Sequence, residues 1–190
     1  MKKIFQNILV VGLGLIGGSI LKNLSKNAFK GNIYGLDKNN EITKEAYRKG
    51  LIENKDNSLK RKYKDWLVIF SVPILSVEDA INSVLDKFSF EEVIFMDTLS
   101  AKSELLSFLK LNPSLRKKFI LSHPIAGSEK SGLENSSPFL FKDKLTIISP
   151  FKINEKESLN RVIKFWEELG SKVSLLDPKK HDSIFSKTSH

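Results

Sequence analysis

Short apolar runs alternate along this chain with longer segments in which apolar residues recur every three or four positions. The runs are typical of strands buried on both faces of a parallel sheet, and the periodic segments are typical of amphipathic helices. Strands are expected at residues 8–11, 33–36, 66–73, 93–97, 119–122, 145–149 and 172–176. Helices are expected at residues 15–24, 41–49, 76–85, 101–111 and 154–169. This alternation predicts an α/β fold with a doubly wound, mostly parallel sheet and right-handed crossovers.

A glycine-rich run follows the first expected strand without a break. It reads Gly12-Leu13-Gly14-Leu15-Ile16-Gly17, which fits the pattern G-x-G-x-x-G. In dinucleotide-binding folds the first glycine allows a tight turn, the second lets the backbone approach a pyrophosphate, and the third lets helix and strand pack closely. The N–H groups at the start of the new helix, at Leu15 and Ile16, would face the phosphates. The alternative is a glycine-rich turn in an ordinary α/β protein.

An acidic residue stands where such a fold needs one. Asp37 follows the second expected strand, 20 residues after Gly17. A carboxylate at this position accepts hydrogen bonds from the ribose hydroxyls of NAD and repels the 2′-phosphate of NADP. Strand, glycines, helix and acid together predict a Rossmann-type domain that binds NAD. Binding of NADP is the less favoured alternative, for which Lys22 and Lys38 leave some room.

Several other strands are expected to end at the edge where a cofactor would lie. The third strand closes with Ser71 and Pro73, which join the expected cofactor-binding residues. Three further polar stretches are expected at this edge, namely residues 97–102, residues 123–129, and the pair 181–182 with 189–190.

His123 is the strongest candidate for chemistry among these residues. Pro124 restricts His123 to an extended backbone, so that the chain leaves its strand in a defined direction. The pKa of an imidazole near neutrality suits the removal of a proton from a substrate hydroxyl while hydride leaves. The alternative is a structural histidine at the end of a strand.

The polar neighbours of His123 have both a functional and an ordinary interpretation. Ser100 either hydrogen-bonds His123 or the substrate hydroxyl, or caps the N-terminus of a helix. Lys102 is interpreted as a solvated helix residue. Glu129 either shapes a substrate pocket or is an exposed loop residue.

Composition excludes several classes of site. The 190 residues suffice for one large domain, or one domain with an extension, and include no cysteine. Disulfides, thiolate catalysis and cysteine-based metal sites are therefore excluded. His181 and His190 would face opposite sides of one helix, so no metal site is expected. The absence of a cleavable leader pattern or a long apolar span predicts a cytoplasmic protein without a membrane partner.

The chain carries a formal net charge of +9, which raises the question of nucleic-acid binding. Its lysines are scattered, and aromatic residues do not alternate with basic ones as they do in stacking platforms. The densest basic cluster comprises Lys60, Arg61, Lys62 and Lys64. We therefore expect a lysine-rich solvated surface and no nucleic-acid partner, with a positive potential that attracts an anionic cofactor and substrate.

Four stretches together resemble the prephenate dehydrogenase family, whose relatives are the arogenate and cyclohexadienyl dehydrogenases of tyrosine biosynthesis. The resemblance covers the chain from its first strand to its last residue, and the loop H-P-x-A-G-x-E-x-S-G makes it specific. The stretches are the run 12–19 (GLGLIGGS), residues 97–102 (DTLSAK), residues 123–132 (HPIAGSEKSG), and 176–178 (LDP) with 181–182 and 189–190.

This resemblance implies an NAD(P)-dependent oxidative decarboxylation. Prephenate would give 4-hydroxyphenylpyruvate and carbon dioxide, with hydride passing to the nicotinamide. By resemblance His123 accepts a hydrogen bond from the ring hydroxyl, and Ser100 is its hydrogen-bonding partner. Glu129 and His190 belong to the substrate pocket.

Two departures from the family pattern stand out. Leu99 occupies a position at which the family usually carries glycine. The family also continues past Ser189-His190 into an all-helical domain that forms a homodimer and supplies further substrate contacts. We therefore expect an NAD-binding domain at 1–177 and, at 178–190, the start of a connecting helix. We expect dimerisation only with the helical domain, and little or no turnover by the 190-residue chain alone.

Other functions stay open from the sequence alone. A preference for arogenate over prephenate is one alternative. A β-hydroxyacid dehydrogenase or an imine reductase would share the fold and the glycine run. A non-catalytic nucleotide-binding module is a further alternative, which the positive net charge supports.

Overall fold

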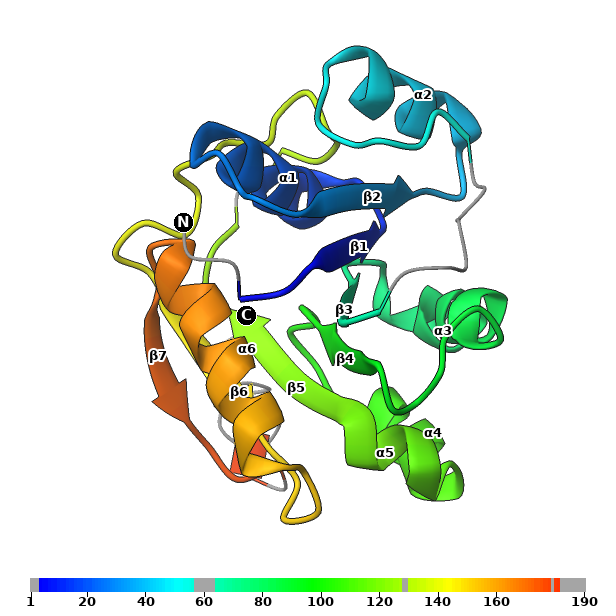
Figure 1. The fold of residues 1–190 in the computed structure, drawn as a ribbon. Helices are drawn as coiled ribbons and strands as arrows, with labels where there is room; N and C mark the ends of the chain where they lie inside the picture. Colours follow the sequence, from blue (N-terminus) through cyan, green and yellow to red (C-terminus); the bar gives the residue numbers. More distant parts are fainter. Residues whose placement is uncertain (1–3, 57–63, 128–129, 179, 182–190) are drawn as a thin grey trace.

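The computed structural model describes residues 4–56, 64–127, 130–178 and 180–181. Seven strands form one sheet in the order β2-β1-β3-β4-β5-β6-β7 (Figure 1). The strands are β1 (Asn7–Val11), β2 (Asn32–Leu36), β3 (Trp66–Phe70), β4 (Val93–Asp97), β5 (Phe119–Pro124), β6 (Leu145–Ser149) and β7 (Lys172–Leu175). The helices are α1 (Leu15–Lys26), α2 (Asn40–Arg48), α3 (Val77–Leu85), α4 (Ser103–Leu111), α5 (Pro113–Lys118) and α6 (Lys156–Glu168), with a short 3₁₀ helix, η1 (Ile74–Ser76).

The sheet is mostly parallel, as the sequence predicts. Strands β1 to β5 run in one direction, and β6 pairs antiparallel with β5. Strand β7 is parallel to β6, so it also runs against the first five strands. The chain passes from β1 to β2 on one side and then returns to β3 on the other. This reversal between β1 and β3 is the switch point at which doubly wound sheets bind ligands.

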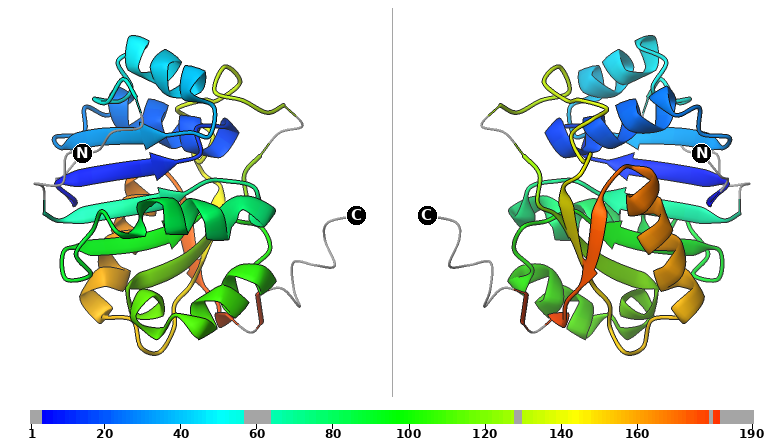
Figure 2. Two further views of the ribbon diagram at one scale, coloured as in Figure 1. Left: turned by 90° about the vertical axis from the view of Figure 1, so that its right-hand side faces the viewer. Right: turned by 90° about the vertical axis from the view of Figure 1, so that its left-hand side faces the viewer.

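Helices cover both faces of the sheet, as the two views of Figure 2 show. Helices α1 and α6 pack on one face over the side chains of Ile8, Val10 and Ile69. Helices α3, α4 and α5 cover the other face, where Phe95 and Leu121 belong to the core. Strands sandwiched in this way have no polar face, which is why they read as continuous apolar runs.

The segment between β4 and β5 differs from the prediction. Helix α4 begins at Ser103 rather than at residue 101, and its N-cap is Lys102. The sequence interpretation of Ser100 as a helix cap was therefore wrong. A second helix, α5, was not predicted; it begins at Pro113, whose fixed φ and missing N–H suit the first position of a helix.

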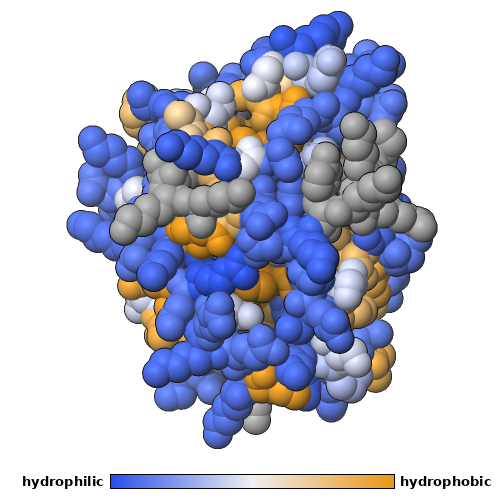
Figure 3. Space-filling view, in the orientation of Figure 1, coloured by the Kyte–Doolittle hydropathy of each residue, from blue (hydrophilic) through white to orange (hydrophobic). Residues whose placement is uncertain are grey.

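The described surface is predominantly hydrophilic, with small separate apolar patches on the face seen in Figure 3. Of the basic cluster near residue 62, Lys60, Arg61 and Lys62 lie outside the described residues, whereas Lys64 lies 3.5 Å from Glu92 in an exposed ion pair. Within the described part of the chain, we find no helix with the length and apolar character needed to cross a membrane.

Candidate functional site

The glycine turn after β1 is packed against the end of β3. Gly12 has a φ of +90°, a conformation that side-chain-bearing residues rarely adopt, and a Cβ there would lie 2.5 Å from the carbonyl oxygen of Ser71. A Cβ on Gly17 would overlap the carbonyl oxygen of Gly12. Both glycines are therefore required by the packing of strand, turn and helix.

Gly14 differs from these two glycines because its side is open. A Cβ added to Gly14 would meet no atom within 4 Å, so the backbone there is accessible to a ligand. Gly14 is also the N-cap of α1, and the first turn of that helix contains no acidic residue. The start of α1 thus has open space beside Gly14, and a helix N-terminus with no acidic residue in its first turn suits a phosphate group.

Asp37 lies directly beside the glycine turn. Its carboxylate Oδ2 accepts a hydrogen bond of 2.8 Å from the backbone N–H of Leu13, and Oδ1 accepts one of 2.9 Å from Asn39. Its own N–H donates to Oγ1 of Thr43 at 3.2 Å. These contacts fix the carboxylate next to the start of α1, where the ribose of a dinucleotide would follow its pyrophosphate.

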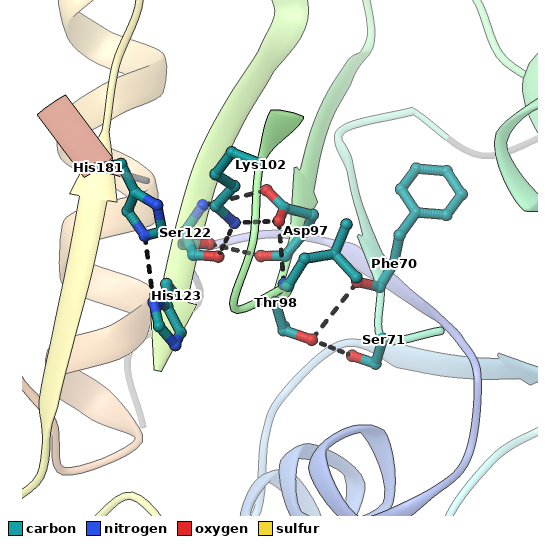
Figure 4. Close-up of polar contacts among 9 residues, drawn as sticks. Phe70, Ser71, Asp97, Thr98, Lys102, Ser122, His123 and His181 are labelled. Carbon is teal, nitrogen blue, oxygen red and sulfur yellow. Dashed lines mark hydrogen bonds and ion pairs between the residues drawn. The ribbon is translucent and has the colours of Figure 1, made fainter. Parts of the chain in front are cut away.

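The ends of the next strands continue the same edge. The N–H of Ser71 donates to the carbonyl of Val11 at 2.7 Å, and Oγ1 of Thr98 donates to Oγ of Ser71 at 3.2 Å (Figure 4). Pro73 is the exposed N-cap of η1. The carboxyl ends of β1, β3 and β4 therefore form one continuous rim.

His123 belongs to this rim. The register pairs Met96 with Ile120, which sets Ser122 level with Thr98 and therefore level with Gly12 and Ser71. Strand β5 is three strands away from β1, about 14 Å at about 4.8 Å per strand. The glycine turn and the histidine thus share one edge of the sheet, as the sequence analysis requires.

A buried ion pair holds the end of β5. Asp97 and Lys102 have no solvent-exposed side-chain surface, and the ammonium of Lys102 pairs with the carboxylate of Asp97. The same ammonium donates to the carbonyl of Ser122 at 2.7 Å, and the N–H of Ser122 donates to the other carboxylate oxygen at 3.1 Å (Figure 4). The hydroxyl of Ser122 donates to the carbonyl of Asp97 at 2.7 Å. The residue that precedes His123 is therefore fixed at every polar atom.

The expectation that Lys102 is solvated was wrong. Lys102 stands three residues before Leu105 and seven before Leu109, two buried residues of α4, so all three occupy one face of the helix register. Its charge is tolerated in the core because Asp97 neutralises it and Ser122 supplies a further acceptor. That spacing was the signal in the sequence that could have revealed the burial.

His123 also contacts a second histidine, which the sequence analysis did not anticipate. Nδ1 of His123 lies 3.1 Å from Nε2 of His181, and the ring centroids are 5.1 Å apart. The sequence analysis placed residues 181–182 at the cofactor edge because they follow the end of the last expected strand. Strand β7 runs the other way, but Pro178, Lys180 and His181 are helical, and His181 lies against His123 at that edge.

The long loop after β5 packs against the first helix. The ammonium of Lys22 donates to the carbonyls of Leu133 and Ser136 at 3.2 and 2.8 Å, and Oγ of Ser19 accepts from the N–H of Ser137 at 3.0 Å. Lys22 is thus engaged by the loop, which weakens its proposed role toward the phosphate of NADP.

A pocket of about 230 Å³ lies at the opposite edge of the sheet, beside Trp66 and Val93 at the amino ends of β3 and β4. It is lined by charged residues of both signs, among them Glu155, whose pKa is lowered by a hydrogen bond from Lys118. This pocket is separate from the glycine turn and from His123.

Comparison with known proteins identifies the family. The family model described as prephenate dehydrogenase, nucleotide-binding domain, matches residues 20–175. The chain belongs to this family.

Individual members of the prephenate dehydrogenase family resemble the chain over nearly its whole length. Prephenate dehydrogenase of Bacillus subtilis is 28% identical over 100% of this chain and 52% of that protein. The crystal structure of prephenate dehydrogenase from Aquifex aeolicus is 34% identical, with a TM-score of 0.86, and the match covers 97% of this chain and 66% of that one. The same enzyme in complex with hydroxyphenyl propionate and NAD+ gives 34% identity and a TM-score of 0.83, over 95% and 63% of the two chains. Arogenate dehydrogenase from Synechocystis is 26% identical, with a TM-score of 0.83, over 97% and 64%.

The chain thus spans about half the length of the curated Bacillus relative and between 63% and 66% of the length of the three solved chains. Two residues expected in a substrate pocket, Glu129 and His190, lie outside the described residues. Ser100 is described and exposed, and no hydrogen bond joins it to His123 among the described residues. Its role toward a substrate stays a prediction.

Proposed function

We propose that this chain binds NAD+ at its glycine turn and is the cofactor-binding part of an NAD-dependent prephenate dehydrogenase. The observation that carries the proposal is the open, uncapped start of α1 at Gly14 beside the oriented carboxylate of Asp37, on the sheet edge that also holds His123. The Aquifex aeolicus relative, crystallised with NAD+ and hydroxyphenyl propionate, supports a pairing of this cofactor with a phenolic acid.

The cofactor-binding residues of this chain have separate roles. Gly14 lets the pyrophosphate approach the backbone, and the amides of Leu15, Ile16 and Gly17 donate to its oxygens. Asp37 accepts hydrogen bonds from the ribose hydroxyls. Gly12 shapes the turn. When bound, the nicotinamide supplies a hydride acceptor.

At the end of β3, Ser71 and Pro73 form the rim between the glycine turn and His123. Ser71 is tied to β1 through Val11 and to β4 through Thr98. A dinucleotide that extends from Gly14 toward His123 must cross this rim. Ser71 and Pro73 therefore line its path.

The reaction that we propose conserves atoms and electrons. Prephenate loses its ring carboxyl as carbon dioxide, a hydride passes from the ring to NAD+, and the products are 4-hydroxyphenylpyruvate, carbon dioxide and NADH. His123 accepts a hydrogen bond from the ring hydroxyl, draws off its proton as the hydride departs, and returns a proton to that oxygen as carbon dioxide leaves and the ring aromatises. Because aromatisation and loss of carbon dioxide favour the products, the protein mainly has to position the reactants. We assign Ser100, Glu129 and His190 to the substrate side of this site.

A preference for NAD over NADP follows from Asp37. Its carboxylate would repel a 2′-phosphate on the adenosine ribose. Lys22, one of the two lysines that could offset this repulsion, donates instead to loop carbonyls. Lys38 is exposed next to Asp37, so it offsets only a small part of this repulsion.

Residues 1–177 form the cofactor-binding domain in this proposal, and residues 178–190 begin the connection to a helical domain that would form the dimer. The last strand, β7, ends at Leu175, and the N–H of Leu176 still donates to Ile148 at 3.0 Å. The sheet therefore closes just before the proposed boundary.

Calorimetric titration of the 190-residue chain with NAD+ and with NADP+ tests the cofactor part of the proposal. We expect binding of NAD+ and at least about tenfold weaker binding of NADP+, equivalent to about 1.4 kcal/mol. Failure to bind NAD+ at millimolar concentration would overturn it.

The substrate part is tested separately, by NADH formation with prephenate and with arogenate. We expect little or no turnover by the 190-residue chain alone, and any turnover to favour prephenate. Arogenate is the second candidate substrate, since the Synechocystis relative is an arogenate dehydrogenase. Turnover of arogenate alone would reassign the substrate, and a normal turnover rate with saturating prephenate would contradict the expectation that the helical domain is needed.

A further inference from the structure

The contact between His123 and His181 has chemical consequences. His181 has no exposed surface, and its Nε2 lies 3.1 Å from Nδ1 of His123. Two imidazoles in such a contact need one donor and one acceptor, so one of the two nitrogens carries the proton. Each choice sets the proton on the other nitrogen of a neutral His123.

Only one of the two arrangements suits a base. If His181 donates to Nδ1 of His123, neutral His123 carries its proton on Nε2 and cannot accept another proton there. If Nδ1–H of His123 donates to His181, then Nε2 of His123 is unprotonated and able to receive the substrate proton. The nitrogen opposite the contact then has the lone pair that the reaction needs.

We propose that His181 is a positioning residue that accepts a hydrogen bond from Nδ1–H of His123 and thereby fixes the tautomer and ring orientation of that base. The catalytic meaning of this contact rests on the function proposed above, whereas the tautomer itself does not. A buried acceptor behind an imidazole plays the same orienting part in other acid–base sites.

The surrounding structure holds His123 in place. The backbone before His123 is fixed by Asp97 and Lys102 through Ser122, and Pro124 restricts the backbone after it. The contact with His181 restricts the rotation of the His123 side chain.

Nitrogen NMR of the imidazoles tests the tautomer directly. The chain contains only three histidines, so a spectrum of the ¹⁵N-labelled 190-residue protein is simple to assign, with His190→Gln identifying the third ring. At a pH at which both imidazoles are neutral, we expect the ¹⁵N chemical shift of His123 Nδ1 in the range of a protonated nitrogen. We expect that of Nε2 in the range of an unprotonated nitrogen. The opposite pattern would overturn the proposal.

Two substitutions separate positioning from mere packing. His181→Leu removes the acceptor, and we expect His123 to become a mixture of tautomers. His181→Gln keeps an acceptor near the same place, and we expect the wild-type tautomer to be retained. A backbone amide spectrum establishes that each variant is folded. If His181→Leu, or a smaller His181→Ala where leucine does not fold, leaves the tautomer of His123 unchanged, the proposal is wrong.

Kinetics then connect the tautomer to the reaction. With prephenate, His181→Leu should lower kcat by about tenfold or more while KM changes little, and His181→Gln should restore most of it. An unchanged kcat in a variant whose tautomer has shifted would overturn the positioning role. Failure of the wild type to bind NAD+, by contrast, is a failure of the proposed function and leaves the NMR result to decide the tautomer.

Discussion

The ammonium of Lys102 and the carboxylate of Asp97 form an ion pair from which solvent is fully excluded. Replacing Lys102 by methionine preserves most of the side-chain volume but leaves Asp97 as an uncompensated buried charge. We expect the free energy of unfolding to fall by about 3–5 kcal/mol, measured by urea denaturation at neutral pH.

Lys44→Met is the matched control for this substitution. Lys44 also pairs with a carboxylate, that of Glu41 at 2.7 Å, but both side chains are about half exposed or more. Exposed pairs of this kind contribute at most about 0.5 kcal/mol. Equal destabilisation by the two variants would contradict a structural role for the buried pair.

Two glycines of the turn should respond differently to alanine. In Gly17→Ala the new Cβ overlaps the carbonyl oxygen of Gly12, so we expect a loss of about 1–3 kcal/mol in the free energy of unfolding. In Gly14→Ala the Cβ enters open space, so we expect a stability change within about 1 kcal/mol.

NAD+ binding, unlike stability, should depend strongly on Gly14. The methyl group would stand where the pyrophosphate approaches, so we expect NAD+ to bind Gly14→Ala about tenfold or more weakly. Calorimetry on the folded variant measures this. Wild-type affinity in Gly14→Ala would show that the ligand does not contact the backbone at this point.

Asp37→Asn tests the selection between the two nicotinamide cofactors. The amide oxygen of asparagine can still accept from the N–H of Leu13, so the turn should survive. Because the negative charge is gone, we expect the ratio of NADP+ to NAD+ affinity to rise about tenfold. Glu157→Gln makes the same change in net charge at the opposite edge of the sheet and should leave the ratio as it is. Equal shifts in both variants would assign the effect to overall charge.

His123→Asn tests the proposed base. We expect NAD+ affinity to stay within about twofold of the wild type, because the glycine turn is three strands away. We expect prephenate turnover to fall about 100-fold or more, the usual contribution of a general base. Retained turnover would exclude His123 from the chemistry.

Much of the fold could be predicted because strands and helices here have clear local patterns. The run 8–11 and the glycines after it indicate a strand, a turn and a helix within ten residues, and β1 and α1 follow this pattern. The ends of the predicted helices were less accurate, since α4 begins at Ser103 rather than at residue 101. Helix α5 escaped prediction because a six-residue helix carries too few apolar positions to show a period.

The candidate site was predicted only in part. His123 and Asp37 could be singled out because each follows an apolar run at a recognisable spacing. The contact between His123 and His181 could not, since it joins residues 58 positions apart. Lys102 was misjudged because lysine is so rarely buried that its spacing from the buried leucines of α4 was given too little weight.

By itself, the sequence determined the order of strands and helices, the glycine turn and the identity of the chemical groups, because these depend on neighbours within a few residues. Only the tertiary structure decided that β6 and β7 run against the other strands, that Lys102 is buried against Asp97, and that His181 reaches His123. These features depend on which distant segments share the interior, and the free energy of burying a charge or an imidazole is set there by partners that no local pattern specifies.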